Sequence, residues 1–307
     1  MRIRCIDRGR GRYRLRSLHL ASGFLATGFL ATGLLATGLL ATGAALLAAG
    51  PAAADNTWAP RLDAVYKLRL LGMEMATFNF GSQVKGDTYA LAGHTKMTWG
   101  MGYFKFAANF SSTGKISGES VRPTSYTYDW QANKKQGSVK LVYGNGAVQS
   151  VQIEPPHTQG PDVVPLKPEH LRGVLDPLSV LMVLSRAIRG GDPCNRKVAV
   201  FEGKQRFDVI FSPKGEETIK EAKPSGQPVK AFVCNARYVP VAGHKMNKET
   251  TAAVKAEGIE VAFRPIPEAN VLVPYRITLP TPAGTAVLTA HKVDISAPGN
   301  RRIALTH

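Results

Sequence analysis

Two segments of the chain have the spacing of a serine nucleophile with a lysine base. Ser82 with Lys85 and Ser112 with Lys115 match the pattern S-x-x-K, in which the lysine activates the serine hydroxyl on a helix. Both pairs lie beside glycine turns between predicted strands, and neither S-D-N nor K-T-G follows them. The sequence also lacks G-x-S-x-G, H-E-x-x-H, the P-loop and G-x-G-x-x-G. It therefore favours a non-catalytic protein over an enzyme, and it predicts no cofactor.

Histidines are the next candidates for chemistry. Those beyond residue 54 are His94, His157, His170, His244, His291 and His307. None is paired with another His, a Cys or a carboxylate at metal-ligand spacing, so we predict no metal site. His244 follows a predicted strand and a turn of small residues, where it could anchor a ligand pocket. A hydrogen bond to a backbone carbonyl is the simpler explanation, because most buried polar groups are satisfied in this way.

Cys194 and Cys234 are the two cysteines outside the N-terminal segment, which contains Cys5. In an exported chain, two cysteines most simply form one disulfide. This bridge would close a loop of about 40 residues and contribute on the order of 4 kcal/mol on the chain-entropy account. A reactive thiol or a metal pair would need a neighbouring histidine or a C-x-x-C spacing, which the sequence lacks. We therefore predict a Cys194–Cys234 disulfide.

Residues 1–54 have the order of a secretory signal peptide. Seven arginines among the first sixteen residues precede an uncharged apolar run from Leu20 to Ala49, which contains five-residue repeats such as ATGLL. Ala52-Ala53-Ala54 then provides a cleavage site before Asp55. We expect cleavage there and a periplasmic location. Because the apolar run is long, a retained inner-membrane anchor is the alternative.

The predicted mature chain is basic. The full sequence has 39 Lys and Arg against 22 Asp and Glu, and residues 1–54 hold seven of the former and one of the latter, which leaves a net charge of +11. In an exported protein this balance favours anionic envelope partners, such as lipid head groups, over nucleic acid. A solvated basic surface with no specific partner explains the charge equally well.

One strong helical pattern must position these residues, and it lies between Leu175 and Gly191. Asp176 can cap the helix, Pro177 suits its first position, and the paired glycines at 190 and 191 can end it. Apolar residues cover almost its whole circumference, which predicts a helix over about 177–189 enclosed by protein. We expect two β-rich halves, residues 61–155 and 196–295, to wrap around it in a single domain, 55–307.

Leu181 and Met182 lie in the middle of this helix and should be enclosed by the two halves. If the helix lines a cavity instead of filling it, Leu181 and Met182 would line a ligand pocket, with His244 as its polar anchor. The sequence does not decide between these two arrangements.

Alternating apolar and polar residues between glycine turns predict strands on both sides of the helix. They lie at 61–71, 73–80, 89–99, 103–110, 125–130, 139–143 and 148–153, and at 197–201, 206–211, 229–238, 259–264, 271–279 and 285–295. Because no helical patterns alternate with them, we predict an antiparallel meander. Prolines between 154 and 171 predict an extended crossing segment, and Pro274 predicts an edge or a bulge. Residues 214–228 should form an exposed loop, 247–257 a short helix, and the tail after Ser296 should be frayed.

Four segments carry a family resemblance. They are LRGVLDPLSVLMVL at 171–184, DPCNRKVAVFEGKQRFDVIF at 192–211, FVCNARYVPVAGH at 232–244 and LVPYRITLPTPAGTAVL at 272–288. Together with the export signal, they resemble a proteobacterial family of exported proteins known only as a domain of unknown function. The resemblance implies an envelope location and a mainly β fold, a curved, open-barrel-like antiparallel sheet, and it transfers no catalytic residue.

Three classes of function remain open on the sequence alone. The first is a non-catalytic envelope protein that binds an apolar or lipid-like molecule, or a peptide, around the helix. The second is a hydrolase acting on cell-envelope material, with a site assembled from distant residues. The third is a structural scaffold for envelope assembly. An open apolar pocket would favour the first, convergent histidines and carboxylates the second, and an exposed apolar patch the third. The sequence does not give the ligand or the oligomeric state.

Overall fold

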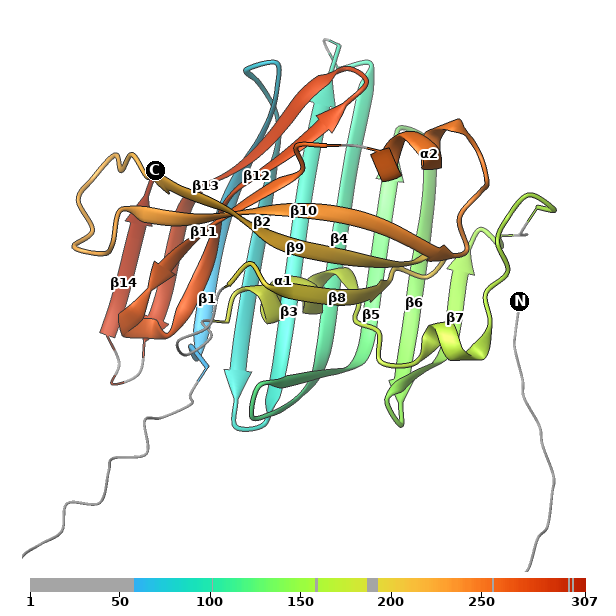
Figure 1. The fold of residues 1–307 in the computed structure, drawn as a ribbon, viewed down its shortest axis with the longest axis horizontal. Coiled ribbons are helices and arrows are strands. Elements are labelled where there is room, and N and C mark those ends of the chain that lie inside the picture. The colour runs from blue at the N-terminus through green and yellow to red at the C-terminus, as the bar shows by residue number, and fades with distance from the viewer. Residues whose placement is uncertain are drawn as a thin grey trace, which may run out of the picture. The chain divides into compact units, whose positions relative to one another are not determined.

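The computed structural model describes residues 58–100, 102–157, 160–186, 193–255, 257–297, 299 and 301–307. The predicted signal peptide, residues 1–54, lies outside the described residues. Within them the protein is mainly β, with one fourteen-stranded antiparallel sheet and two short α-helices (Figure 1). Neither helix in this described part has the length and apolar character needed to cross a membrane.

The first half of the chain is an up-and-down meander in which each strand pairs with the next. Its strands are β1 (Arg61–Leu70), β2 (Met73–Lys85), β3 (Thr88–Trp99), β4 (Phe104–Ser117), β5 (Ser120–Ala132), β6 (Lys135–Gly144) and β7 (Ala147–Glu154). The predicted meander is confirmed, and most strands are longer than their apolar alternation indicated. A short 3-10 helix (Pro168–Leu171) interrupts the proline-rich crossing segment that follows.

The second half of the chain completes the sheet. It consists of α1 (Pro177–Leu184), β8 (Arg196–Phe201), β9 (Arg206–Thr218), β10 (Lys230–Ala242), α2 (Lys248–Lys255), β11 (Glu260–Ile266), a 3-10 turn (Pro267–Ala269), β12 (Val271–Thr281), β13 (Gly284–Ala297) and β14 (Arg301–Thr306). The strand order is β7-β6-β5-β4-β3-β2-β1-β13-β12-β11-β10-β9-β8, so β13 joins the two halves through β1.

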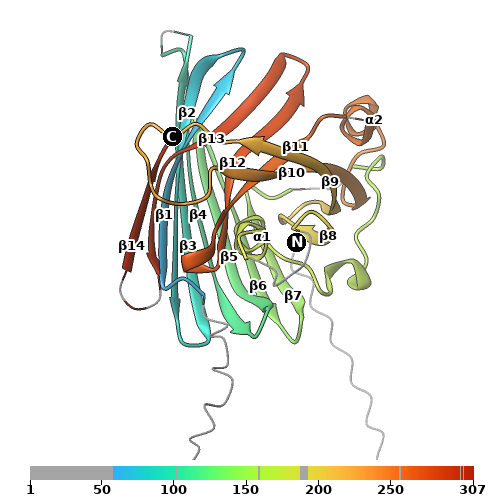
Figure 2. The same cartoon turned by 60° about the vertical axis from the view of Figure 1, so that its left-hand side comes forward.

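The sheet forks at β13. One edge of β13 pairs with β1, whereas the other edge pairs with β12 over its first residues and with β14 over its last residues. From this fork, β12 to β8 turn away from β14 and cross the inner face of the meander (Figure 2). The helix α1 lies between β3–β5 on one side and β8 on the other. The predicted curved sheet around one central helix is therefore confirmed.

The helix α1 ends at Leu184, five residues earlier than the predicted end at 189. The chain leaves the helix there because Arg186 forms a bridge with Val271 of β12, and the Leu272 N–H donates to the Ser185 carbonyl at 2.7 Å. The glycine pair at 190 and 191 lies outside the described residues.

Two faces of α1 belong to two apolar clusters. Leu178 and Met182 pack into the larger cluster beneath β1–β7, while Val180 and Leu184 pack into the cluster beneath β8–β12. Met182 is buried as expected, whereas Leu181 packs against the larger cluster but is only half-buried, because it lies between the two buried faces of the helix. The buried cysteines Cys194 and Cys234 are bonded as a disulfide, with their Cα atoms 5.2 Å apart, and belong to the second cluster.

Three further expectations need correction. Residues 214–218 extend β9 and pair with β10, so the exposed loop is confined to 219–229. Gly114, between Ser112 and Lys115, lies inside β4 and not in a turn. The tail after Ser296 is not frayed: β13 continues to Ala297, and β14 pairs with β13. Alternate side chains of β14, Ile303 and Leu305, are buried. Pro274 does lie at a register shift between β11 and β12, as predicted.

His307 follows β14 and is held by Arg264, whose side chain is fully buried. Arg264 donates to His307 Nε2 at 2.8 Å, to Glu221 Oε1 at 2.6 Å and to the Pro228 carbonyl at 2.9 Å. Burial and the positive charge of Arg264 lower the pKa of His307 to about 4. One buried guanidinium thus fixes both the 219–229 loop and the end of β14.

The two buried faces of α1 generate a matched test within one helix. Leu178→Ala should lower the free energy of unfolding by about 2 to 5 kcal/mol, because it removes a fully enclosed leucine. Leu181→Ala should cost less than half as much, since part of this side chain is already in water. Denaturant unfolding of both variants measures the difference. Equal losses would contradict the orientation of the helix.

The lowered pKa of His307 predicts a dependence of stability on pH. Between about pH 6.5, the ordinary histidine pKa, and about 4, the unfolded chain binds a proton that the folded protein does not. The stabilisation from this group is therefore present above that window and is lost as the pH falls through it. Denaturant titrations at several pH values measure the unfolding free energy. Its fall from about pH 6.5 to about pH 4 should be smaller in His307→Gln than in the wild type, whereas His157→Gln, at an exposed position, should leave that fall unchanged. Parallel curves for wild type and His307→Gln would contradict this.

Candidate ligand-binding site

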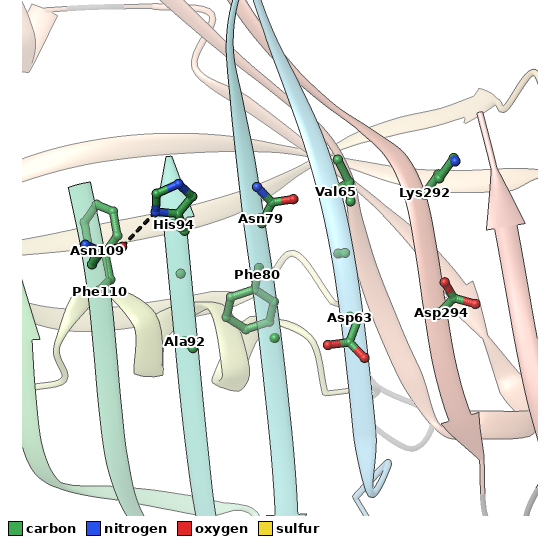
Figure 3. A pocket seen from close by; sticks show the side chains of 13 residues that line it. Asp63, Val65, Asn79, Phe80, Ala92, His94, Asn109, Phe110, Lys292 and Asp294 are labelled. Atoms are coloured by element: carbon green, nitrogen blue, oxygen red, sulfur yellow. Dashed lines mark hydrogen bonds between the residues drawn. The ribbon is translucent and has the colours of Figure 1, made fainter. Parts of the chain in front are cut away.

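The outer face of the sheet carries a shallow hollow of about 590 Å³, over β1–β4 and β13 (Figure 3). Small residues, Gly81 and Ala92, form part of its floor. The polar side chains around it are Asp63, Asn79, His94, Asn109, Lys292 and Asp294. His94 Nδ1 lies 2.7 Å from Asn109 Oδ1.

The polar groups of this hollow do not form a reactive set. Asp63 is paired with Arg61 at 2.5 Å and Asp294 with Arg302 at 3.0 Å, and both ion pairs are open to water. Among the residues that the structure describes, no group of three or more His, Cys, Asp or Glu could hold a metal ion. The hollow therefore offers neither a positioned nucleophile with its base nor a metal centre.

A buried polar cluster lies at the start of α1. Asp176, fully buried, accepts the Leu178 and Ser179 N–H groups through Oδ1 at 3.0 and 2.9 Å. Its Oδ2 accepts the hydroxyls of Ser179 and of Ser112 in β4 at 2.6 and 2.9 Å. Burial raises the pKa of the Asp176 carboxyl, and these four hydrogen bonds oppose that shift. The cluster is a helix cap extended into the sheet.

Tyr89 of β3 completes this cluster. Its hydroxyl lies 2.8 Å from Ser179 Oγ, and burial raises its pKa to about 12. Gly114 is required beside it, because a Cβ there would lie 2.4 Å from the Tyr89 hydroxyl oxygen. Ser112 therefore points inward while Lys115 is exposed on the opposite face, and the S-x-x-K pair does not come together. The cluster is sealed from solvent and has no access for a substrate.

The inner face of the sheet is divided along the strands. The lower part, near Leu62, Tyr89 and Ser112, is covered by α1, and the small cavity that remains beside Met182 measures about 30 Å³. The strands β1–β4 extend well beyond α1 and β10 (Figure 1). The inner face over that extension is not covered by the helix.

The inward side chains over this extension are almost all apolar. They are Leu68, Ala76, Phe78, Met97, Phe106, Trp130 and Leu288, which we call the open inner face. All seven are half-buried. Thr95 is the polar exception beside them. Its hydroxyl donates a hydrogen bond to the Thr77 carbonyl at 3.0 Å, so its donor is already paired within the sheet.

A row of aromatic rings, of which Phe78 is part, runs along the boundary between the covered part and the open inner face. Tyr66 and Phe78 lie 6.2 Å apart between ring centroids, Phe78 and Phe110 6.0 Å, and Phe110 and Tyr128 4.8 Å in a stacked arrangement. Gly93 lies between Phe78 and Phe110, and a Cβ there would be 3.0 Å from the Phe78 ring. The rings, from β1, β2, β4 and β5, thus form a continuous apolar floor across five strands.

The three residues predicted for a pocket do not lie together in one cavity. Met182 lines the small cavity, together with Trp58 and Arg186, whose guanidinium stacks 4.5 Å from the Trp58 ring. Leu181 packs against the larger core cluster. His244 follows β10 and is buried; its backbone carbonyl accepts the Val164 N–H at 3.0 Å, but its side-chain Nδ1 does not make the expected bond to a backbone carbonyl. The open inner face was not anticipated, although the apolar alternation of its strands was visible in the sequence.

Comparison with known proteins returns a family and a solved structure. The family model described as "Protein of unknown function (DUF3108)" matches residues 64–291. No curated protein matches the chain. A similar solved structure is a β-barrel-like protein of the domain of unknown function DUF1849 from Brucella abortus, with 11% identity, 78% of this chain and 98% of that chain covered, and a TM-score of 0.43.

The buried cap generates a prediction about stability. Asp176→Ala removes the acceptor of four hydrogen bonds and should cost about 2 to 4 kcal/mol of unfolding free energy. Asp176→Asn should cost less, because its amide oxygen still accepts the two backbone N–H groups, while the serine hydroxyls can turn to accept from its amide nitrogen. Thermal or denaturant unfolding compares the two. Equal losses would show that the charge, and not the cap geometry, is what matters.

Proposed function

This chain belongs to the DUF3108 family, proteins of unknown function, and we propose that it is a non-catalytic cell-envelope protein that binds a lipid-like molecule on the open inner face of its sheet. The observation that carries this proposal is the run of half-buried apolar side chains beyond α1. Folded proteins rarely leave such a surface in water unless something covers it, because each exposed Å² of apolar area costs about 25 cal/mol.

The chemistry of the open inner face favours an acyl chain over a peptide. A peptide needs hydrogen-bond partners for its own backbone, and the backbone groups of β1–β5 are already paired within the sheet. Thr95 is satisfied internally, and its neighbours carry no polar atoms apart from the Trp130 indole N–H. An acyl chain requires only apolar contact, which Phe78, Met97 and Phe106 can supply.

An envelope location is part of the proposal. It rests on the basic, apolar and small-residue order of residues 1–54, and a disulfide between Cys194 and Cys234 suits an oxidising compartment. The hydrolase alternative gains nothing from the described residues, because their polar clusters are either sealed, as at Asp176, or already ion-paired, as at Asp63. The scaffold alternative requires an exposed apolar patch that binds another protein, and the open inner face is instead only half-buried within the sheet.

The first test identifies the occupant directly. Protein purified from the cell envelope, without exposure to added lipid, should release an acyl-chain lipid when it is denatured and analysed by mass spectrometry. The amount should approach one lipid per chain. Released peptide, or no bound molecule together with no uptake of a fluorescent fatty acid, would contradict the proposal.

A matched pair of variants locates the binding surface. Met97 points inward and its neighbour Thr98 points outward, so Met97→Asn and Thr98→Asn introduce the same side chain on opposite faces of β3. Met97→Asn should weaken binding of a fluorescent fatty acid roughly fivefold, which corresponds to about 1 kcal/mol of lost apolar contact. Thr98→Asn should bind as the wild type does. If both variants bind equally, the probe lies elsewhere.

A further inference from the structure

Exposed apolar side chains gather at one end of the sheet. The turns β1–β2, β3–β4 and β12–β13 all lie at the same end, beyond the open inner face (Figures 1 and 2). These turns and the strand ends beside them carry five exposed apolar side chains, Leu71, Met73, Trp99, Tyr103 and Leu279, which we call the hairpin patch. Tyr103 is 87% exposed and Leu71 67% exposed, so these side chains point into solvent and do not pack in the core.

The hairpin patch is continuous across neighbouring strands. In the sheet, β3, β2, β1, β13 and β12 follow one another, and Leu70 pairs with both Met73 and Ala286. The side chain of Leu71 packs against Gly284, the first residue of β13: a Cβ on that glycine would lie 2.4 Å from Leu71 Cδ2. The three turns therefore present one apolar edge and not scattered residues.

Positive charge surrounds the patch. The segments 67–77, 96–107, 131–137 and 278–287 contain six basic residues and one acid, Glu74, which pairs with Lys67 at 3.0 Å. The five other basic side chains are exposed: Arg69, Lys96, Lys105, Lys134 and Lys135. This part of the molecule combines apolar tips with an unbalanced cationic rim.

We propose that the hairpin patch docks on the surface of an anionic lipid bilayer. Trp and Tyr side chains favour the boundary between head groups and acyl chains, because their rings are apolar and their N–H and O–H groups remain hydrated. Trp99 and Tyr103 would lie at this boundary, with Leu71 and Met73 inserted beside them. The lysines and arginine would contact anionic head groups, which attract basic residues close to the membrane surface.

The bilayer explains the patch better than a protein partner does. The apolar side chains lie along one edge of the sheet, at the ends of narrow hairpins with glycines at 72, 100 and 102, and not on a flat face that could bury area against another chain. The hairpin patch shares no residue with the open inner face, so membrane docking and lipid binding can be tested independently. If both hold, docking brings the open end of that face against the lipid.

Tryptophan quenching by brominated phospholipids tests the insertion. The chain contains three tryptophans, at 58, 99 and 130, and Trp58 lies at the opposite end of β1 from the patch. With phosphatidylglycerol vesicles that carry bromine on the acyl chains, wild-type fluorescence should be quenched. Trp99→Phe should remove most of the quenching, while Trp58→Phe should leave it. Absence of quenching in the wild type, or equal quenching in Trp99→Phe, would overturn the proposal.

Vesicle flotation tests the charge. Lys96→Glu with Lys105→Glu should lower binding to phosphatidylglycerol vesicles at least roughly tenfold. The matched control reverses Lys220 and Lys223, two exposed lysines in the 219–229 loop, and should bind as the wild type does. Unfolding midpoints must agree among the variants. Equal binding to purely zwitterionic vesicles, or a dimer in light scattering that Tyr103→Ser dissolves, would overturn the bilayer as the partner.

Discussion

The carboxylate of Asp176 is the interaction on which the architecture depends. An isolated helix of eight residues does not form in water, so α1 exists only because tertiary contacts hold it. Asp176 satisfies two of its free N–H groups and ties the same end to Ser112 in the middle of β4. The cap therefore determines where α1 begins and where it crosses the sheet.

The position of α1 divides the inner face into a filled part and an open part. On the filled side, Leu178 and Met182 complete the core of the meander, and Val180 and Leu184 complete the core beneath β8–β12. On the other side of the aromatic row, the same strands continue to direct apolar side chains inward without a helix above them. The proposal of a binding function rests on this division of the inner face and not on any reactive group.

The sequence predicts what depends on local patterns and misses what depends on distant pairing. The cap at Asp176, the meander and the bulge at Pro274 follow from residue types and spacing. The end of α1 does not, because the bridge from Arg186 to Val271 joins segments 85 residues apart. The same holds for β14: its short alternation of apolar and polar residues forms a strand only because it pairs with β13.

The open inner face could have been inferred from lengths that the sequence already contains. A helix with its side chains is about 10 Å wide, and a strand rises roughly 3.4 Å per residue, so a helix lying across a sheet covers about three residues of each strand. The strand β4 has fourteen residues. Apolar alternation that continues along such a strand exceeds what one crossing helix can bury. The apolar side chains beyond the helix, such as Phe106, therefore remain only half-buried.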